Sequence, residues 1–299
     1  MRAPQDTSPL RTTAKRIIKV PRLFESQSNT TLRVAKYYDS PCRKVLRLSE
    51  SSTPPTSKKT NSLNHLPPPN ILLENGACIV LNKPGGLLTQ GPPGIDSLEL
   101  RVKQFLKVRD EKPGKVYLGV PHRLDRPVSG VMVVVKNVRA AKRLSEQFRE
   151  RTVKKIYWAV VEGVVQQDSG TWRDHMQKID GQAKSQIVAA DAEKAQEAIL
   201  NFKVRARTDN RTWLQIKLET GRTHQIRLQA SHHGHPIVGD ELYNATTTFG
   251  PETHDIRKKW IGLHARQLGF THPISKEEIE QVAPLSEYWA SLPFDFDAE

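Results

Sequence analysis

Three consecutive prolines, Pro67-Pro68-Pro69, divide the chain into two parts with different prospects of folding. Proline fixes its own φ angle and has no N–H group, so neither a helix nor a central strand continues through three of them. Apolar residues recur with helix or strand spacing only after this point. We therefore expect one folded unit over residues 67–299, with residues 1–66 outside its core.

Residues 1–66 are basic and rich in serine and threonine. They hold thirteen Lys and Arg residues against four Asp and Glu, an excess of nine positive charges out of the chain's net +14. No apolar periodicity lasts for a whole helix, which predicts a largely disordered extension. Three roles stay open for it: a non-specific RNA-binding arm, an organellar transit peptide, or an extension without a function.

The composition of the whole chain favours a polyanionic partner inside the cell. A net charge of +14 is typical of nucleic-acid-binding proteins. It also fits a soluble basic protein whose charge only prevents aggregation. Cys42 and Cys78 form no Cys-x-x-Cys pair, which fits a reducing compartment. Apolar runs such as 131–135 are too short to span a bilayer. We expect a cytoplasmic protein without membrane contact, or an organellar one if the extension is a transit peptide.

Beyond the prolines, the spacing of apolar residues predicts an α+β fold. The sequence between 198 and 218 reads as two strands joined by a turn at Asp209-Asn210, which forms an antiparallel hairpin. Because hairpins outnumber βαβ units, we expect a central, mostly antiparallel sheet with flanking helices and loops. Strands are predicted over 77–81, 129–135, 156–161, 198–206, 213–218 and 262–270, and helices over 97–107, 138–149 and 223–234.

A carboxylate between two arginines is the first candidate for chemistry. Asp125 follows Arg123 and precedes Arg126, in a polar loop directly before the strand at 129. Neighbouring cations favour an ionised aspartate, which can act as a nucleophile or stabilise positive charge at a sugar carbon. Without further context, the loop equally fits an ordinary surface ion pair.

Two further segments carry candidate residues. Gly221 permits a tight strand-to-helix turn, from which Arg222 would project to clamp a carboxylate or phosphate; alternatively Thr223 caps the helix and Arg222 is solvated. In the strand at 156–161, alternation places Tyr157 and Trp158 on opposite faces. One of the two could stack on a base, with lysines nearby for phosphate, or both could simply be packing residues.

Metal and nucleotide sites are not expected. The four histidines His224, His232, His233 and His235 lack the spacing of a zinc-binding helix. The glycines at 85, 86, 91 and 94 match neither a phosphate-binding loop nor a dinucleotide fingerprint.

Taken in order, these motifs closely resemble the RluA family of RNA pseudouridine synthases, over about residues 70 to 275. Together the six are highly specific, where any one would be weak. They are Asn82-Lys83-Pro84-Gly85-Gly86-Leu87, His122-Arg123-Leu124-Asp125 with Ser129-Gly130, Lys155-Ile156-Tyr157-Trp158-Ala159-Val160-Val161-Glu162-Gly163, Thr220-Gly221-Arg222-Thr223-His224-Gln225-Ile226-Arg227, Gly234-His235-Pro236-Ile237-Val238-Gly239-Asp240 and Leu263-His264-Ala265.

The resemblance implies a cofactor-free isomerisation of uridine in RNA, with Asp125 as the catalytic carboxylate. Arg222 would pair with Asp125 and keep it charged. Tyr157 would stack on the flipped uracil and help to move the proton from its C5 carbon. Arg123 would fill the gap that the extracted nucleotide leaves, and Leu263 would wall the pocket.

The expected partner is structured RNA, either ribosomal or transfer RNA, bound by a monomer without a nucleotide cofactor. Arg126, Lys154 and Lys155 would add to the positive lining of the cleft. Residues 1–66 show no S4-type RNA-binding pattern, so the target stays open. Two rival hypotheses are a non-catalytic RNA-binding protein with the same fold and a metal-dependent hydrolase that uses the histidines.

Overall fold

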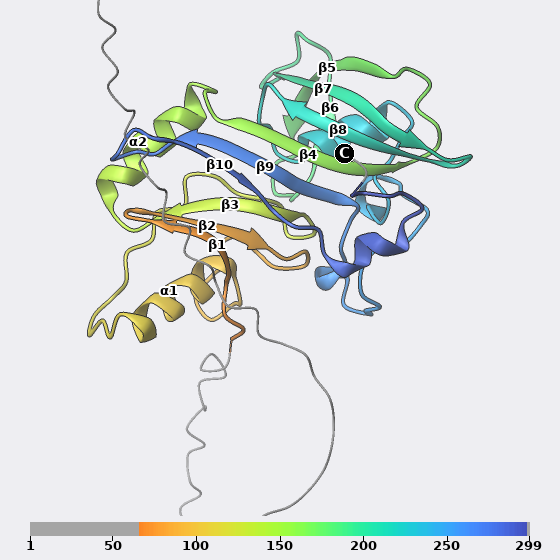
Figure 1. Ribbon diagram of the computed structural model, residues 1–299. Coiled ribbons are helices and arrows are strands. Elements are labelled where there is room, and N and C mark those ends of the chain that lie inside the picture. The colour runs from red at the N-terminus through yellow and green to blue at the C-terminus, as the bar shows by residue number, and fades with distance from the viewer. Residues whose placement is uncertain (1–65, 298–299) are drawn as a thin grey trace, which may run out of the picture. The chain divides into compact units, whose positions relative to one another are not determined.

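The computed structural model describes residues 66–297. Its main feature is a ten-stranded sheet in the order β1-β2-β3-β9-β4-β8-β7-β5-β6, with β10 paired to β9 (Figure 1). The strands are β1 (Asn70–Asn75), β2 (Cys78–Lys83), β3 (Ser129–Val135), β4 (Lys154–Glu162), β5 (Ser169–Lys178), β6 (Ser185–Ile187), β7 (Gln196–Arg207), β8 (Arg211–Leu218), β9 (Leu263–Thr271) and β10 (Glu278–Val282). The helices are α1 (Leu98–Arg109), α2 (Val138–Arg149) and α3 (Gln225–His232), with 3-10 turns η2 (Glu241–Tyr243), η3 (Ile256–Lys258) and η4 (Glu287–Ser291).

The sheet is antiparallel at every paired junction except that between β3 and β9. This confirms the predicted α+β class with a mostly antiparallel sheet. The predicted hairpin is formed by β7 and β8, and β3 and α2 begin and end where the spacing placed them. The strands β1, β5, β6 and β10 were not predicted.

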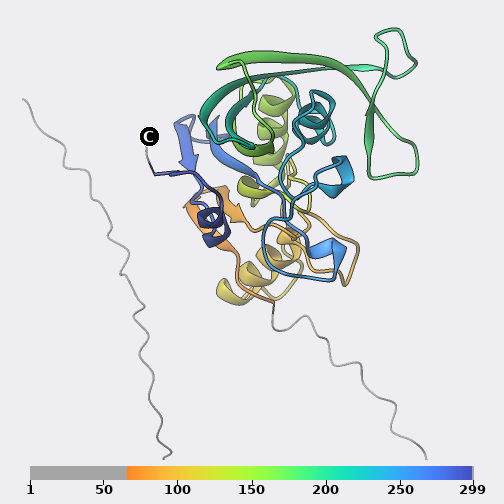
Figure 2. The same cartoon turned by 90° about the vertical axis from the view of Figure 1, so that its right-hand side faces the viewer.

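Helices α1 and α2 bury only part of the apolar residues whose spacing predicted them, since Val138 at the start of α2 is exposed. Helix α1 begins at the cap Ser97, whose Oγ accepts from the Leu100 N–H, and it lies beside β1 and β2 (Figure 1). Helix α2 packs on β3 and buries Ala140 and Leu144. In the turned view the loops beside β5 and β7 extend away from α1 and α2 (Figure 2).

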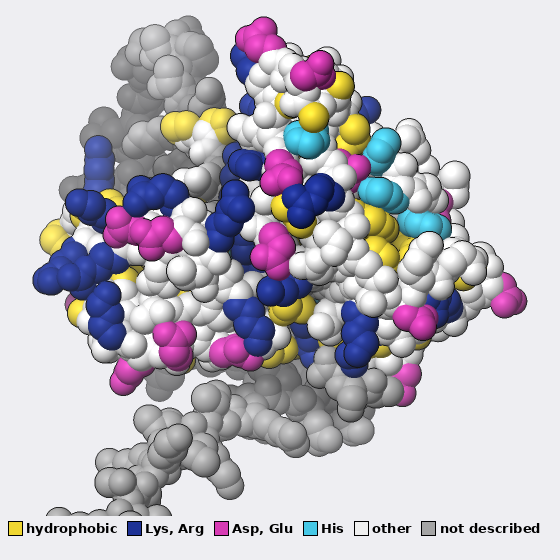
Figure 3. All heavy atoms as spheres, turned by 90° about the horizontal axis from the view of Figure 1, so that it is seen from above, with side chains coloured by type: hydrophobic (Ala, Val, Ile, Leu, Met, Phe, Trp, Pro, Cys, Tyr) yellow, Lys and Arg dark blue, Asp and Glu magenta, His cyan; other side chains and the backbone are white. Residues whose placement is uncertain are grey.

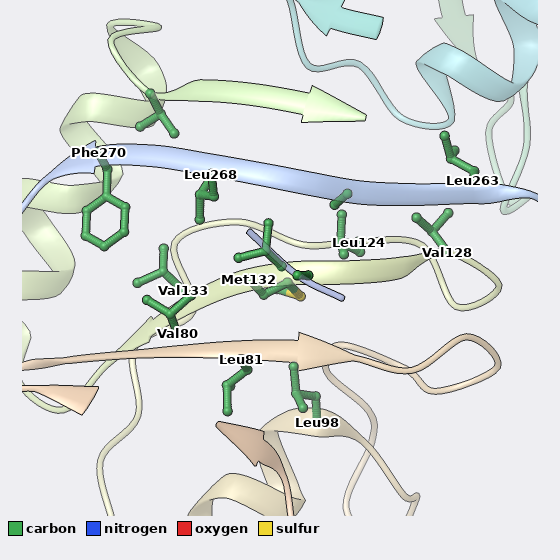
Figure 4. Close-up of a cluster of buried hydrophobic side chains, with 14 of the residues drawn as sticks. Val80, Leu81, Leu98, Leu124, Val128, Met132, Val133, Leu263, Leu268 and Phe270 are labelled. Atoms are coloured by element: carbon green, nitrogen blue, oxygen red, sulfur yellow. The ribbon is translucent and has the colours of Figure 1, made fainter. Parts of the chain in front are cut away.

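The junction of β3 and β9 is the seam of the sheet. The two strands meet along two residue pairs, Ser129 with His264 and Gly130 with Ala265. Beyond these two pairs, β3 and β9 are held together by the packing of buried apolar side chains. Figure 4 shows this cluster, to which β2, β3, β9 and α1 contribute. The seam therefore depends on a close backbone approach at one short place.

Gly130 makes that approach possible. Its φ is +120°, a conformation that L residues rarely adopt, and a Cβ atom built on it would lie 2.3 Å from the Ala265 carbonyl oxygen. Any side chain at this position would push the two strands apart.

Helix α3 starts later than predicted. The expected helix was 223–234, but Thr223 caps nothing and His224 has a left-handed φ of 57°. The Gln225 side chain explains this turn, since its Oε1 accepts from the Arg222 N–H and from the Thr220 hydroxyl. The chain therefore turns sharply over 222–224 before the helix begins.

The prediction for the extension 1–66 falls, apart from Leu66, outside the described residues. Within 66–297, no helix is both long enough and apolar enough to span a bilayer.

Replacing Gly130 by alanine is expected to lower the free energy of unfolding by about 3 kcal/mol or more, because backbone strain and overpacking each cost about 1–3 kcal/mol. The control is Gly94→Ala, where φ is also positive but no atom lies within 4 Å of the added Cβ. Urea denaturation measures both variants. An equal loss in the two would show that the seam does not need its glycine.

Candidate active site

A cavity of about 540 Å³ opens beside the seam of the sheet. Its walls come from the loop at 121–128, the passage from α2 into β4, the segment 218–227 and the start of β9. Six of the eight site residues predicted from the sequence line it: Arg123, Asp125, Lys155, Tyr157, Arg222 and Leu263. The fold therefore brings together residues that lie far apart along the chain.

The other two predicted residues, Arg126 and Lys154, do not line the cavity, so that part of the prediction is corrected. Lys154 precedes Lys155 in β4 and points to the opposite face, where its Nζ lies 3.2 Å from Glu280 Oε2. Arg126 contributes its main-chain carbonyl, which accepts a hydrogen bond from Lys83 Nζ at 3.2 Å.

Arg227 is the arginine that contacts Asp125. Its Nη1 donates to Asp125 Oδ2 at 3.3 Å, while its Nε and Nη2 donate to the two carboxylate oxygens of Asp240 at 2.6 and 2.8 Å. Burial opposes the charge of Arg227, but the hydrogen bonds and charge of Asp240 more than offset it and raise the pKa of the guanidinium. Asp240 thus fixes the plane of Arg227, and Arg227 presents one N–H to Asp125.

The expected pairing of Arg222 with Asp125 is wrong. Arg222 Nε donates to the Glu197 carbonyl at 3.0 Å, and its side chain lies in the cavity wall. The cause is the late start of α3, since the left-handed His224 turns the chain and places Arg227 on the inner face of the first helical turn. The sequence signal for Arg227 was its place between Ile226 and Leu228, where a charged residue needs a buried partner.

His224 completes the surroundings of Asp125. Its Nε2 lies 3.6 Å from Asp125 Oδ2, and its Nδ1 lies 2.9 Å from the Tyr243 hydroxyl. Burial lowers the pKa of His224, although the charge of Asp125 works in the opposite direction. His224 is therefore a mainly uncharged neighbour of the carboxylate near neutral pH.

Tyr157 faces the cavity from β4, and Trp158 lies on the other face of the strand within an aromatic cluster. The predicted alternation of these two residues is confirmed. Burial, and then the negative charge of Asp125, raise the pKa of the Tyr157 phenol. Tyr157 thus keeps its proton beside an acidic group.

Two buried polar side chains, Thr89 and Lys83, bind the main chain directly before and after Asp125. The Thr89 hydroxyl donates to the Leu124 carbonyl at 2.7 Å and accepts from the Leu124 N–H at 3.2 Å. Lys83, which is fully buried, donates to the carbonyls of Pro84 and Leu87 as well as that of Arg126. Burial lowers the pKa of Lys83 to about 7, and the nearby Asp125 opposes that fall. The main chain is therefore fixed on both sides of Asp125.

His122 holds the same loop from the side of β3. Its Nε2 accepts the Val133 N–H at 3.1 Å, and its ring stacks on Phe148 at 4.4 Å. Burial lowers the pKa of His122 to about 3, so the ring is neutral and can accept this bond. The loop thus covers the edge of β3 beyond the seam.

The histidines considered for a metal site are spread over three places. His224 faces Asp125, whereas His232 and His233 lie 3.7 and 3.1 Å from Asp174. His235 Nδ1 lies 3.2 Å from the Glu162 carbonyl. Residues 66–297 hold no group of three His, Cys, Asp or Glu side chains arranged to bind a metal ion.

Solved structures with this architecture are pseudouridine synthase domains. Human RNA Pseudouridylate Synthase Domain Containing 4 matches with a TM-score of 0.60 and 25% identity, over 74% of this chain and 90% of that one. Human RNA Pseudouridylate Synthase Domain Containing 1 matches with a TM-score of 0.56 and 25% identity, over 75% and 84%.

Curated relatives agree with the structural matches. An uncharacterized RNA pseudouridine synthase of Synechocystis is 32% identical over 75% of this chain and 68% of its own length. Ribosomal large subunit pseudouridine synthase D of Xanthomonas campestris is 37% identical over 74% and 67%. Ribosomal large subunit pseudouridine synthase C of Haemophilus ducreyi is 31% identical over 85% and 77%.

The fold and the relatives that share it define an enzyme of the RNA-isomerising class. The family model for RNA pseudouridylate synthase matches residues 77–232, and the chain belongs to this family. The resemblance to the RluA family and the expected activity, isomerisation of uridine in RNA, are thereby confirmed. Asp240 and Leu263 lie beyond the matched range, so their place in the site comes from the structure.

Removal of the Arg227 side chain is expected to lower the free energy of unfolding by about 3–5 kcal/mol, because Asp240 would remain buried without a partner. Arg222→Ala is the control and should change it by less than about 0.5 kcal/mol, since Arg222 only bonds a carbonyl at the cavity wall. Urea denaturation compares the two. Equal effects would contradict the assignment of Arg227 as the buried partner.

Proposed function

We propose that Asp125 is the catalytic carboxylate and that the substrate is large-subunit ribosomal RNA. Asp125 supplies the single carboxylate among the described residues that line the cavity, and this observation carries the proposal. The names of the relatives from Xanthomonas and Haemophilus support ribosomal RNA over transfer RNA.

The reaction exchanges one bond to the ribose for another. The bond between uracil N1 and ribose C1′ breaks, and a bond between uracil C5 and C1′ forms. The proton that leaves C5 is matched by one that N1 gains. The exchange consumes no oxidant, reductant or second substrate, which agrees with the cofactor-free reaction implied by the family resemblance.

Asp125 would act on the sugar through one particular oxygen. Both Arg227 and His224 approach Oδ2, and none of the described residues forms a hydrogen bond with Oδ1. As the glycosidic bond breaks, positive charge develops at C1′, which an ionised carboxylate can stabilise or attack. Oδ1 is thus the oxygen that faces the substrate, and Arg227 sets its direction.

Tyr157 would hold the base while it turns. Its ring lies in the cavity wall, so it can stack on the free uracil. The Tyr157 phenol stays protonated, so its oxygen can accept the proton that leaves C5 while its own proton passes on toward N1.

The target uridine must leave its stack before it can reach Asp125, because a stacked nucleotide hides its glycosidic bond. Arg123 is exposed in the cavity wall, two residues before Asp125, and would enter the gap left by the extracted nucleotide. A ribosomal target agrees with a cytoplasmic location, or with an organelle that has ribosomes if residues 1–66 are a transit peptide.

Chemical mapping of pseudouridine in cells that lack the gene tests the proposal. One or more positions of large-subunit ribosomal RNA should lose pseudouridine and regain it with the wild-type protein. Asp125→Asn should restore none, because its rate is expected to fall by at least about a thousandfold.

Purified Asp125→Asn is the binding control and should hold the same RNA within about threefold of wild type, since it keeps the shape of the side chain. Restoration of pseudouridine by this variant would refute the role of Asp125. Loss of pseudouridine only from transfer RNA would refute the ribosomal target.

A further inference from the structure

Most of the positive charge in the cavity wall is not used by the proposed chemistry. Besides Arg227, five cationic residues line the cavity, against the single carboxylate of Asp125. Two of these cations, Arg149 and Arg151, were not singled out by the sequence and have no part in the reaction. Their position calls for a ligand with several negative charges.

Arg149 and Arg151 lie where α2 passes into β4. Arg149 is the last residue of α2, and Arg151 has a left-handed φ of 60°. Both side chains are exposed, and both line the cavity. In the view from above, Lys and Arg side chains gather over the left and middle of the face (Figure 3).

Two further cations, Lys155 and Arg222, line the cavity next to these arginines. Burial, and next the charge of Arg151, lower the pKa of Lys155. Lys155 Nζ in turn lies 3.8 Å from the position of a Cβ on Gly221, the residue before Arg222. We call Arg149, Arg151, Lys155 and Arg222 the cationic rim.

A purely structural role explains the rim poorly. Arg149 pairs with Glu146 at 2.9 Å, but both side chains are largely exposed, and such pairs stabilise little. No carboxylate within residues 66–297 forms an ion pair with Arg151. The left-handed conformation of Arg151 is the ordinary end of α2, since the N–H groups of Arg151 and Thr152 bond the carbonyls of Phe148 and Gln147. The like charges of Arg149, Arg151 and Lys155 lie close together, and a bound anion would offset their repulsion.

The end of α2 cannot attract an anion through its backbone. The last turn of a helix exposes carbonyl groups and carries partial negative charge. Any attraction for phosphate at this place must therefore come from the side chains of Arg149 and Arg151. This separates the rim from an ordinary anion site at a helix start.

We propose that the cationic rim binds backbone phosphates of the RNA beside the target uridine, with Arg149 and Arg151 as the outer contacts. The inference rests on the proposed function, because it takes the cavity as the place of the extracted uridine. The rim holds the chain that leads out of the cavity, and Asp125 acts on the nucleotide inside.

The test compares Arg149→Ala/Arg151→Ala with Arg139→Ala/Lys142→Ala in the full-length protein. Arg139 and Lys142 are exposed on the same helix outside the cavity, so both variants remove two charges. Binding to a poly(U) oligonucleotide is measured over a range of salt concentrations. The maximal single-turnover rate is measured on large-subunit ribosomal RNA.

The rim variant should bind about tenfold or more weakly, and its slope of log affinity against log salt should fall by about 0.7 for each phosphate that it no longer binds. Its maximal rate at saturation should stay within about twofold of wild type, since Asp125 and its partners are untouched. Arg149→Lys/Arg151→Lys should recover most of the slope because it restores the charge.

Equal binding by the rim variant and the Arg139/Lys142 control would overturn the proposal. So would a fall in maximal rate without any fall in affinity. Failure of the proposed function would look different, since wild type would then form no pseudouridine in the ribosomal RNA while the binding comparison would still report on the rim.

Discussion

The buried ion chain from Asp240 through Arg227 to Asp125 is the interaction on which the site depends. It joins the turn before η2, the first turn of α3 and the loop before β3. A guanidinium with little exposure is costly unless its N–H groups are matched, and Asp240 matches two of them with nearly ideal distances. The Nη1 group is therefore aimed at Asp125, and the direction of this contact is fixed by Asp240, which is buried away from the solvent.

The seam between β3 and β9 explains why the aspartate loop lies where it does. β3 pairs with β9 only at Ser129 and Gly130, so the edge of β3 beyond Gly130 can bond other partners. His122 accepts a hydrogen bond from that edge, and Thr89 and Lys83 bind the main chain on either side of Asp125. The site is thus formed where the sheet is interrupted, by a loop that replaces the missing strand contacts.

Sequence spacing predicted those parts of the fold that alternate clearly or carry one apolar stripe. Strand β5 was missed because only Trp172 and Met176 are buried along its ten residues. The ordered motifs of the family pointed to Asp125, Tyr157 and Leu263, and the structure brings these three residues together in one cavity. The partner of Asp125 was missed because Arg222 and Arg227 share one motif, and only the left-handed turn at His224 decides between them.

The rate of chemistry in Asp240→Asn is the most direct test of the ion chain. Asp240 is 1% exposed and outside the cavity wall, so its replacement cannot remove a contact with RNA. Single-turnover pseudouridine formation at saturating enzyme should fall by about a hundredfold, because Arg227 loses its orientation, while the dissociation constant for RNA stays within about threefold. A folded Asp240→Asn enzyme with the wild-type rate would contradict the account.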